Sequence, residues 1–135
     1  MDIDRKRVED DLRGVVVGDV FCDELSVQLY ASDASIYQVL PLGVVRPKSA
    51  EDLAACVRYA VEQKISIHAR GAGSGVAGES LGRGLVIDFS TYMRRWRGGN
   101  DSSDSLRDPS RFEQVRVQPG VVLAALNREL LPHGR

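Results

Sequence analysis

The sequence has few residues that bind metals or form cross-links. Its 135 residues include two cysteines, Cys22 and Cys56, and two histidines, His68 and His133. The cysteines lie far apart with no CxxC spacing, and each histidine is isolated, so neither a zinc site nor a disulfide framework is indicated. We therefore expect no bound metal and two reduced thiols.

The sequence also has no excess of charge of either sign. Lys and Arg number 18 against 19 Asp and Glu, a formal net charge of -1, which gives no indication of a nucleic-acid partner or an anionic membrane surface. No apolar run reaches the ~20 residues of a membrane-spanning helix, and residues 1–14 are charged, without the apolar core of a signal peptide. We expect no nucleic-acid partner, no membrane span and a cytoplasmic location.

The patterns that are present predict helices in the first half of the chain, whose length fits one domain. Residues 4–13 suit a short charged helix that ends at Gly14. Ser49 is a predicted helix N-cap with Asp52 three residues on, a variant of the capping box, and an amphipathic helix is predicted over residues 50–63. Its apolar stripe is expected to consist of Leu53, Cys56, Val57, Ala60 and Val61.

Strands are predicted before that helix and on both sides of a glycine-rich loop. Residues 43–47 and 84–90 are short apolar runs, and residues 64–69 alternate apolar and polar side chains. The buried face of the alternating strand is expected to carry Ile65, Ile67 and Ala69. His68 falls on the other face, where we interpret it as a partly exposed structural histidine.

The last part of the chain is predicted to hold a loop, a strand and a helix. Residues 97–111 are rich in Gly, Ser and Asp and predict a solvent-exposed loop whose shortening changes stability little. Residues 112–120 form a strand that ends in a Pro119-Gly120 turn, and residues 121–130 form a helix. The inward positions of these two elements are expected to be Val115, Val117, Leu123, Leu126 and Leu130. Because the sequence stops just after a helix and a turn, we expect it to be a piece of a longer protein.

The glycine-rich loop, IHARGAGSGVAGES at residues 67–80, raises the question of what approaches its bare backbone. Its glycines fit GxGxxG, but five residues, ESLGR, separate Gly78 from the strand at Gly84. That is too short for the crossover helix of a dinucleotide-binding fold. A P-loop is excluded because Glu79 stands where that motif needs a lysine.

A third interpretation keeps the backbone and needs no helix. Successive amides of a tight Gly/Ala/Ser loop form a concave nest for an anion, and a diphosphate fits such a nest without a lysine. Ser74 adds a hydroxyl donor, and Arg70 stands at the strand end, where it either braces the loop or lies near the ligand. A glycine-rich connection without a ligand remains the alternative.

Residues 44–96 resemble, segment by segment, the flavin-binding half of FAD-linked oxidases, the flavoproteins related to vanillyl-alcohol oxidase and p-cresol methylhydroxylase (PCMH). The resemblance is greatest to FAD-dependent 2-hydroxyacid dehydrogenases such as D-lactate dehydrogenase and glycolate oxidase. It begins near YASDASIYQVLPLGVVRP and runs to VQPGVVLAALNRELLPHG, about three-quarters of the chain. It implies an α+β fold, a small mixed sheet flanked by helices, as the first subdomain of a PCMH-type FAD-binding domain. Residues 1–29 are then a charged helix and lead-in, and residues 30–135 the N-terminal part of that domain, truncated at its C-terminus.

The same resemblance implies where FAD binds. In relatives, the loop that matches residues 70–75 wraps the diphosphate with backbone amides, and the QPG turn lines the cofactor. The implied cofactor-binding residues are Arg70, Gly71, Ala72, Gly73, Ser74, Gly75, Gly78, Gln118, Pro119 and Gly120. Ser74 stands where some relatives carry a histidine that tethers the flavin, so we expect FAD to be noncovalent. Pro47 matches a proline near the adenine side, and Asp33 and Ser35 are expected to make local turn hydrogen bonds.

The resemblance further implies an FAD-dependent oxidoreductase that oxidises a small 2-hydroxy acid by hydride transfer to the flavin. No catalytic residue can be nominated here, because in relatives those residues follow the matched region, and the electron acceptor is not indicated. We expect this fragment alone to be inactive. Three alternatives stay open: a sugar or alcohol substrate, reduction of an enolpyruvyl group, and a non-enzymatic module that binds no flavin.

Overall fold

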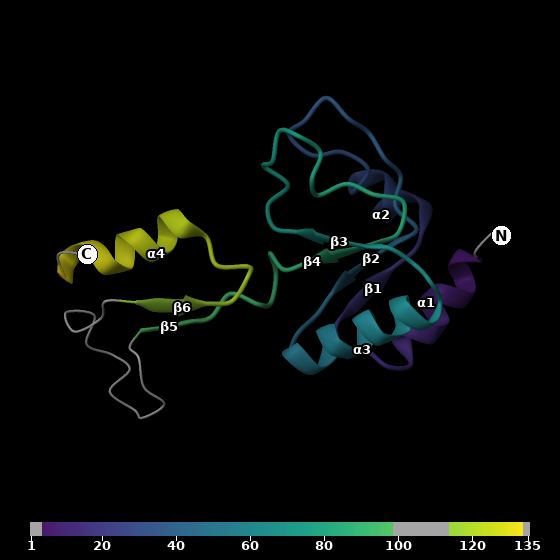
Figure 1. The fold of residues 1–135 in the computed structure, drawn as a ribbon, viewed down its shortest axis with the longest axis horizontal. Helices are drawn as coiled ribbons and strands as arrows, with labels where there is room; N and C mark the ends of the chain where they lie inside the picture. The colour runs from purple at the N-terminus through teal and green to yellow at the C-terminus, as the bar shows by residue number, and fades with distance from the viewer. Residues whose placement is uncertain (1–3, 99–113, 134–135) are drawn as a thin grey trace.

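The computed structural model describes residues 4–98 and 114–133. Its elements follow one another in a mixed order of helices and strands (Figure 1). They are α1 (Arg5–Arg13), β1 (Asp19–Phe21), α2 (Glu24–Leu29), β2 (Gly43–Arg46), α3 (Ala50–Glu62), β3 (Ile67–Arg70), β4 (Leu85–Asp88), β5 (Trp96–Gly98), β6 (Val115–Val117), α4 (Leu123–Leu130) and a short 3-10 turn (Leu131–His133).

The main sheet has four strands in the order β1-β2-β4-β3. Strands β2, β4 and β3 are parallel, whereas β1 pairs antiparallel to β2 at one edge. The three parallel strands therefore all end at the same edge of the sheet. This small mixed sheet with flanking helices confirms the predicted α+β class.

Helix α3 begins where the sequence predicts, but Asp52 acts differently from the capping box. The Ser49 hydroxyl accepts a hydrogen bond from the Asp52 amide, as an N-cap does. The Asp52 carboxylate, 4% exposed, accepts hydrogen bonds from the amides of Lys48 and Val17, both at 2.9 Å. It therefore joins the helix N-terminus to the segment between α1 and β1. Val17 in that segment is 35 positions from Asp52 in the chain.

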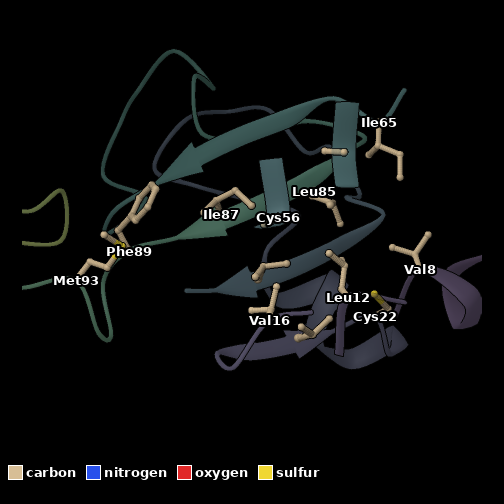
Figure 2. Packing of buried hydrophobic residues seen from close by; sticks show 13 residues of the cluster. Val8, Leu12, Val16, Cys22, Cys56, Ile65, Leu85, Ile87, Phe89 and Met93 are labelled. Carbon is tan, nitrogen blue, oxygen red and sulfur yellow. The ribbon is translucent and has the colours of Figure 1, made fainter. Parts of the chain in front are cut away.

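The hydrophobic core lies between the main sheet and helices α1 and α3 (Figure 2). Leu85 and Ile87 of the central strand β4 face Cys56 of α3, while Leu12 of α1 closes the core beside β1. The core also contains Val8, Val16, Val20, Cys22, Val45, Ala60, Ile65, Phe89 and Met93. Because α1 and β1 contribute to this core, the charged N-terminal stretch is packed together with the rest of the sheet.

A second, smaller layer follows the sheet. Strands β5 and β6 form an antiparallel pair, and α4 lies alongside them, away from the four-stranded sheet (Figure 1). The Trp96 indole N–H donates to the Glu129 carboxylate at 3.0 Å, and Leu126 and Leu130 are buried. The described residues thus form two sheets joined by the connections around Met93 and Gly120.

Several expected positions are wrong because burial depends on what packs over a face. Val61, Val117 and Leu123 were expected inside and are exposed. Ile67 is 40% exposed because β3 is the edge strand, and Ala69 is exposed with it. An alternating pattern predicts a strand but not whether a neighbour covers its apolar face.

The sequence patterns also missed one element and misplaced the start of another. Helix α2, capped by Asp23, was not predicted. Arg97 and Gly98, assigned to a loop, belong to β5 and pair with β6. The rest of the predicted loop, residues 99–111, lies outside the described residues. The domain division at residues 29 and 30 remains a prediction.

Candidate functional site

The glycine-rich segment, residues 71–84, leaves β3 at the edge where the parallel strands end and returns to the opposite edge, where β4 begins. It contains no helix, which agrees with the argument against a dinucleotide fold based on its length. The two strands are parallel nevertheless, since the irregular loop itself makes the crossover (Figure 1). The crevice at the carboxyl ends of parallel strands is where open α/β sheets bind their ligands.

The glycines of this loop serve two different purposes. Gly73 and Gly78 have positive φ angles, +67° and +77°, which favour glycine. Side chains at Gly82 and Gly84 would collide with the His68 ring and the Ser66 backbone, so these two glycines serve internal packing. A Cβ at Gly71 would meet nothing within 4 Å. Packing therefore requires glycine at the end of the loop, at Gly82 and Gly84, whereas the space in front of Gly71 at its beginning is open.

The backbone amides at the beginning of the loop are uncommitted. Within residues 4–98 and 114–133, no group accepts a hydrogen bond from the amides of residues 71–75. By contrast, the carbonyls of Arg70 and Gly73 accept from Phe89 and Ala34, at 3.0 and 2.9 Å. An unpaired run of amides is what an anion-binding nest requires.

One internal anion lies beside this run of amides. The Glu79 carboxylate accepts from the Ala77 amide at 3.1 Å and lies where a Cβ of Gly75 would be. The glycine at position 75 thus makes room for a side chain of the same loop. The sequence analysis used Glu79 only to exclude a P-loop and missed this contact.

Residues 31–37 pack against the glycine loop and form hydrogen bonds with it. The Asp33 carboxylate accepts from the Ser35 amide at 2.9 Å, the local turn expected from the sequence, and also from the Ser80 hydroxyl at 2.9 Å. The hydrogen bond from Ser35 lowers the pKa of Asp33. The Tyr37 ring lies 2.9 Å from the Cβ position of Gly78. Together with the Ala34 amide on the Gly73 carbonyl, these contacts hold residues 73, 78 and 80 of the loop against one segment.

A row of charged side chains crosses the three strand ends beneath the loop. Asp88 of β4 is the register partner of Arg70 of β3, and Arg46 of β2 follows directly after the last paired residue of β2, Val45. The Arg46 guanidinium is 3.2 Å from the Asp88 carboxylate, and the Tyr30 hydroxyl donates to the same Asp88 oxygen. The other Asp88 oxygen accepts from the Ser90 amide at 2.8 Å.

Asp88 is ionised in this setting, although only 3% of it is exposed. Burial by itself raises the pKa of a carboxyl group, but the hydrogen bonds from Tyr30 and Ser90 and the charge of Arg46 outweigh it and hold the pKa below its usual value. Burial and the bond to Asp88 raise the pKa of Tyr30, so its hydroxyl keeps its proton.

Arg70 differs from Arg46 in having no carboxylate partner. None of the ion pairs among the described residues includes it. Its guanidinium lies 5.1 Å from the centre of the Tyr30 ring and 2.6 Å from the Cβ position of Gly73. It also donates a hydrogen bond to the Tyr30 carbonyl at 3.4 Å, and its charge adds to the Ser35 hydrogen bond in lowering the pKa of Asp33. The site therefore combines bare amides with a guanidinium that forms no ion pair, a combination that suits a diphosphate.

The QPG turn lies close to the start of the glycine loop. A Cβ at Gly120 would collide with the Phe89 carbonyl, and the Phe89 amide donates to the Arg70 carbonyl. The Gln118 side-chain oxygen is already engaged by the Arg95 amide at 2.8 Å. The turn is thus next to the loop, but part of Gln118 is committed to holding its own connection. Pro47 is fully buried, which leaves its ring no surface for a ligand.

The remaining reactive side chains are structural. Burial raises the pKa of Cys56 to about 12 and that of Cys22 to about 11, so both are thiols at neutral pH. His68 is half-buried, and its Nε2 lies 3.2 Å from the Ser66 hydroxyl. Among the described residues, no group of three His, Cys, Asp or Glu side chains could hold a metal ion. No helix in the described part of the chain is long and apolar enough to span a membrane.

Comparison with known proteins places the chain in a family. Residues 41–135 match the family described as FAD binding domain, and the chain belongs to it. It is 34% identical over 117 residues to D-2-hydroxyglutarate dehydrogenase from Escherichia coli (strain K12). The matched region covers 84% of this chain and 10% of that protein. It is 30% identical over 136 residues to glycolate oxidase subunit GlcD from the same strain, covering 98% of this chain and 25% of GlcD. The chain therefore spans about a tenth to a quarter of the curated relatives it matches.

Solved structures confirm the fold. The 6-hydroxy-D-nicotine oxidase from Arthrobacter nicotinovorans superposes with a TM-score of 0.70 at 23% identity, covering 88% of this chain and 24% of the oxidase. An alkyldihydroxyacetonephosphate synthase gives a TM-score of 0.70 at 20% identity, covering 98% of this chain and 26% of that protein. The chain has the fold of the PCMH-type FAD-binding domain, and FAD is the cofactor of its family.

Proposed function

We propose that the glycine loop and the adjacent QPG turn hold the diphosphate of FAD. The observation that carries the proposal is the run of amides at residues 71–75, which donate to no described group and lie at the carboxyl ends of the parallel strands. The proposed cofactor residues are the ten named from the sequence. They are Arg70, Gly71, Ala72, Gly73, Ser74, Gly75, Gly78, Gln118, Pro119 and Gly120.

The residues present suit the diphosphate for three reasons. Gly71 leaves open space in front of the backbone, since a Cβ there would meet nothing within 4 Å. Arg70 supplies a positive charge that forms no ion pair with a described carboxylate. Two carbonyls that could repel an anion, those of Arg70 and Gly73, are turned to the amides of Phe89 and Ala34. Glu79 opposes the fit at Gly75, and its carboxylate must move if the ligand reaches that far.

The protein that contains this chain is proposed to oxidise a small 2-hydroxy acid. The relatives that it matches are named for D-2-hydroxyglutarate and glycolate, both 2-hydroxy acids. FAD supplies the redox chemistry when bound, and this chain binds and orients it. No side chain of the described residues is assigned a catalytic role.

The cofactor is proposed to be held without a covalent bond. Ser74 has a hydroxyl where tethered relatives carry an imidazole, and Cys22 and Cys56 are buried away from the loop. A cytoplasmic location is likewise a proposal, and the electron acceptor remains unassigned.

The test uses the purified full-length protein. We expect flavin absorbance that acid denaturation releases as free FAD, together with anaerobic bleaching by D-2-hydroxyglutarate, D-lactate or glycolate but not by glutarate, which has no hydroxyl group. Bleaching by an aldose or a simple alcohol instead supports the alternative substrate class. Flavin that stays with the denatured chain contradicts noncovalent binding. A protein that neither carries FAD nor binds added FAD contradicts the proposed function.

A further inference from the structure

Tyr30 lies at the centre of the charged row, yet the proposed function gives it no part. It is the residue that follows α2, and its ring lies between the side chains of Arg46 of β2 and Arg70 of β3. The guanidinium carbons of Arg46 and Arg70 are 5.9 and 5.1 Å from the ring centre. One aromatic side chain therefore contacts both cations of the row, within the range of cation–π attraction.

The Tyr30 hydroxyl determines how the row's carboxylate is shared. It donates to one oxygen of Asp88 and accepts from Arg46 Nη2 at 2.8 Å and Arg46 Nε at 3.1 Å. The second Asp88 oxygen is taken by the Ser90 amide. Both oxygens of Asp88 are thus engaged, one by Arg46 and Tyr30 and the other by the Ser90 amide, and the carboxylate does not pair with Arg70.

Arg70 is nevertheless as close to Asp88 in the sheet as Arg46 is. Arg70 and Asp88 are direct register partners on adjacent parallel strands, which lie about 5 Å apart. An ion pair between them is therefore within easy reach. Such a pair would neutralise the guanidinium that faces the glycine loop.

We propose that Tyr30 is a positioning residue for the diphosphate site: its hydroxyl holds Asp88 on Arg46 and so leaves the charge of Arg70 for the ligand. This inference rests on the proposed function. Tyr30 does not touch the ligand in this scheme, because it acts through Asp88 and Arg70. The net effect is a row of two cations and one anion whose remaining positive charge lies on the loop side.

The first experiment compares FAD dissociation constants of the full-length apoprotein, measured by quenching of flavin fluorescence. Tyr30→Phe keeps the ring and removes the hydroxyl. We expect about tenfold weaker FAD binding. When Asp88 pairs with Arg70, the diphosphate loses a hydrogen bond from the charged guanidinium. FAD binding should also become less sensitive to added salt. Tyr59→Phe is the matched control, since its hydroxyl also donates to a carboxylate, Asp11, at 2.9 Å on the α1–α3 side.

The second experiment separates positioning from a general loss of packing. Adding Asp88→Asn to Tyr30→Phe removes the competing carboxylate, and we expect affinity to return to within about threefold of the wild type, since Arg70 is again unpaired. If the doubly substituted protein melts below the assay temperature, the Arg70→Gln background replaces it. There, Tyr30→Phe should cause no further loss of affinity.

The outcomes distinguish this inference from the proposed function. Unchanged binding in Tyr30→Phe, or a double variant as weak as Tyr30→Phe itself, overturns the inference alone. So does an equal loss in Tyr59→Phe, or a further loss in the Arg70→Gln background. A wild-type protein that does not bind FAD overturns the proposed function and the inference together.

Discussion

Gly71 is the position in the glycine loop at which a ligand and the protein's own packing can be separated. Gly73, Gly75 and Gly78 each have a side chain of the same protein close to their Cβ positions, from Arg70, Glu79 and Tyr37. Gly71 has none within 4 Å. A methyl group there disturbs nothing that the structure contains, so any effect on FAD binding reports the ligand itself.

At this residue scale, we expect Gly71→Ala to keep its melting temperature within a few degrees and to lose most of its affinity for FAD. The methyl group occupies the space that the diphosphate needs next to the amide. Thermal unfolding and flavin retention on a desalting column measure the two effects. Gly14→Ala, at the exposed end of α1, is the control. Full FAD content in Gly71→Ala would contradict the placement of the diphosphate.

At the scale of elements, helix α3 depends on a single buried carboxylate. Asp52 accepts the amides of Lys48 and Val17, which joins α3 to the segment before β1. The Ser49 cap satisfies a further amide at the same helix end. Because Asp52 is 4% exposed, water does not readily replace these bonds.

We therefore expect Asp52→Ala to lower the free energy of unfolding by about 1 to 3 kcal/mol, the cost of leaving buried amides without a partner. Urea denaturation followed by circular dichroism provides the measurement. Glu62→Ala, at the exposed last residue of the same helix, is the control, and its unfolding free energy should change little. A loss no greater for Asp52→Ala than for the control would show that the hydrogen bonds of Asp52 contribute nothing to stability.

At the scale of the whole molecule, hydrogen-bonded carboxylates determine the response to acid. The pKa of Asp88, Asp33 and Asp23 is lowered below the usual 3.8. A carboxyl with a lowered folded-state pKa stabilises the fold above its unfolded pKa. That stabilisation is lost as the pH falls through the folded value, because the unfolded chain then binds more protons.

The expected result is a melting temperature that changes little from about pH 7 to 5 and falls steeply below about pH 4. Scanning calorimetry across this range tests it. Asp88→Asn should melt lower at neutral pH, since Arg46 loses its partner, and should show a shallower decline in acid. An acid decline as steep as that of the wild type would exclude Asp88 as a major contributor.

Much of the local structure could be predicted from short patterns. The Ser49 cap and the spacing of apolar residues predicted α3, Gly14 ended α1, and the apolar run at 43–47 predicted β2. Helix α2 was missed, although Asp23 caps it by accepting from the Ser26 amide. Its six residues are too few for a hydrophobic period to be visible.

The candidate site divides in the same way. The sequence pointed to the glycine loop and, through Asp33 and Ser35, to its supporting turn, because both features depend on neighbours within a few positions. Tyr30, Arg46 and Asp88 were missed because they are 16 to 58 positions apart in pairs that make contact. No local pattern marks such a cluster.

The sequence by itself determined helices α1, α3 and α4 and strands β2, β3, β4 and β6, that the loop after β3 is too short for a crossover helix, and that its backbone is bare. The tertiary structure alone decided that β3 and β4 run parallel, that Arg46, Asp88 and Arg70 share one row, and that Ile67 and Val61 remain uncovered. The physical reason is range. Capping, periodicity and glycine conformation are settled within one or two turns of chain, whereas register and burial depend on which distant segment packs alongside.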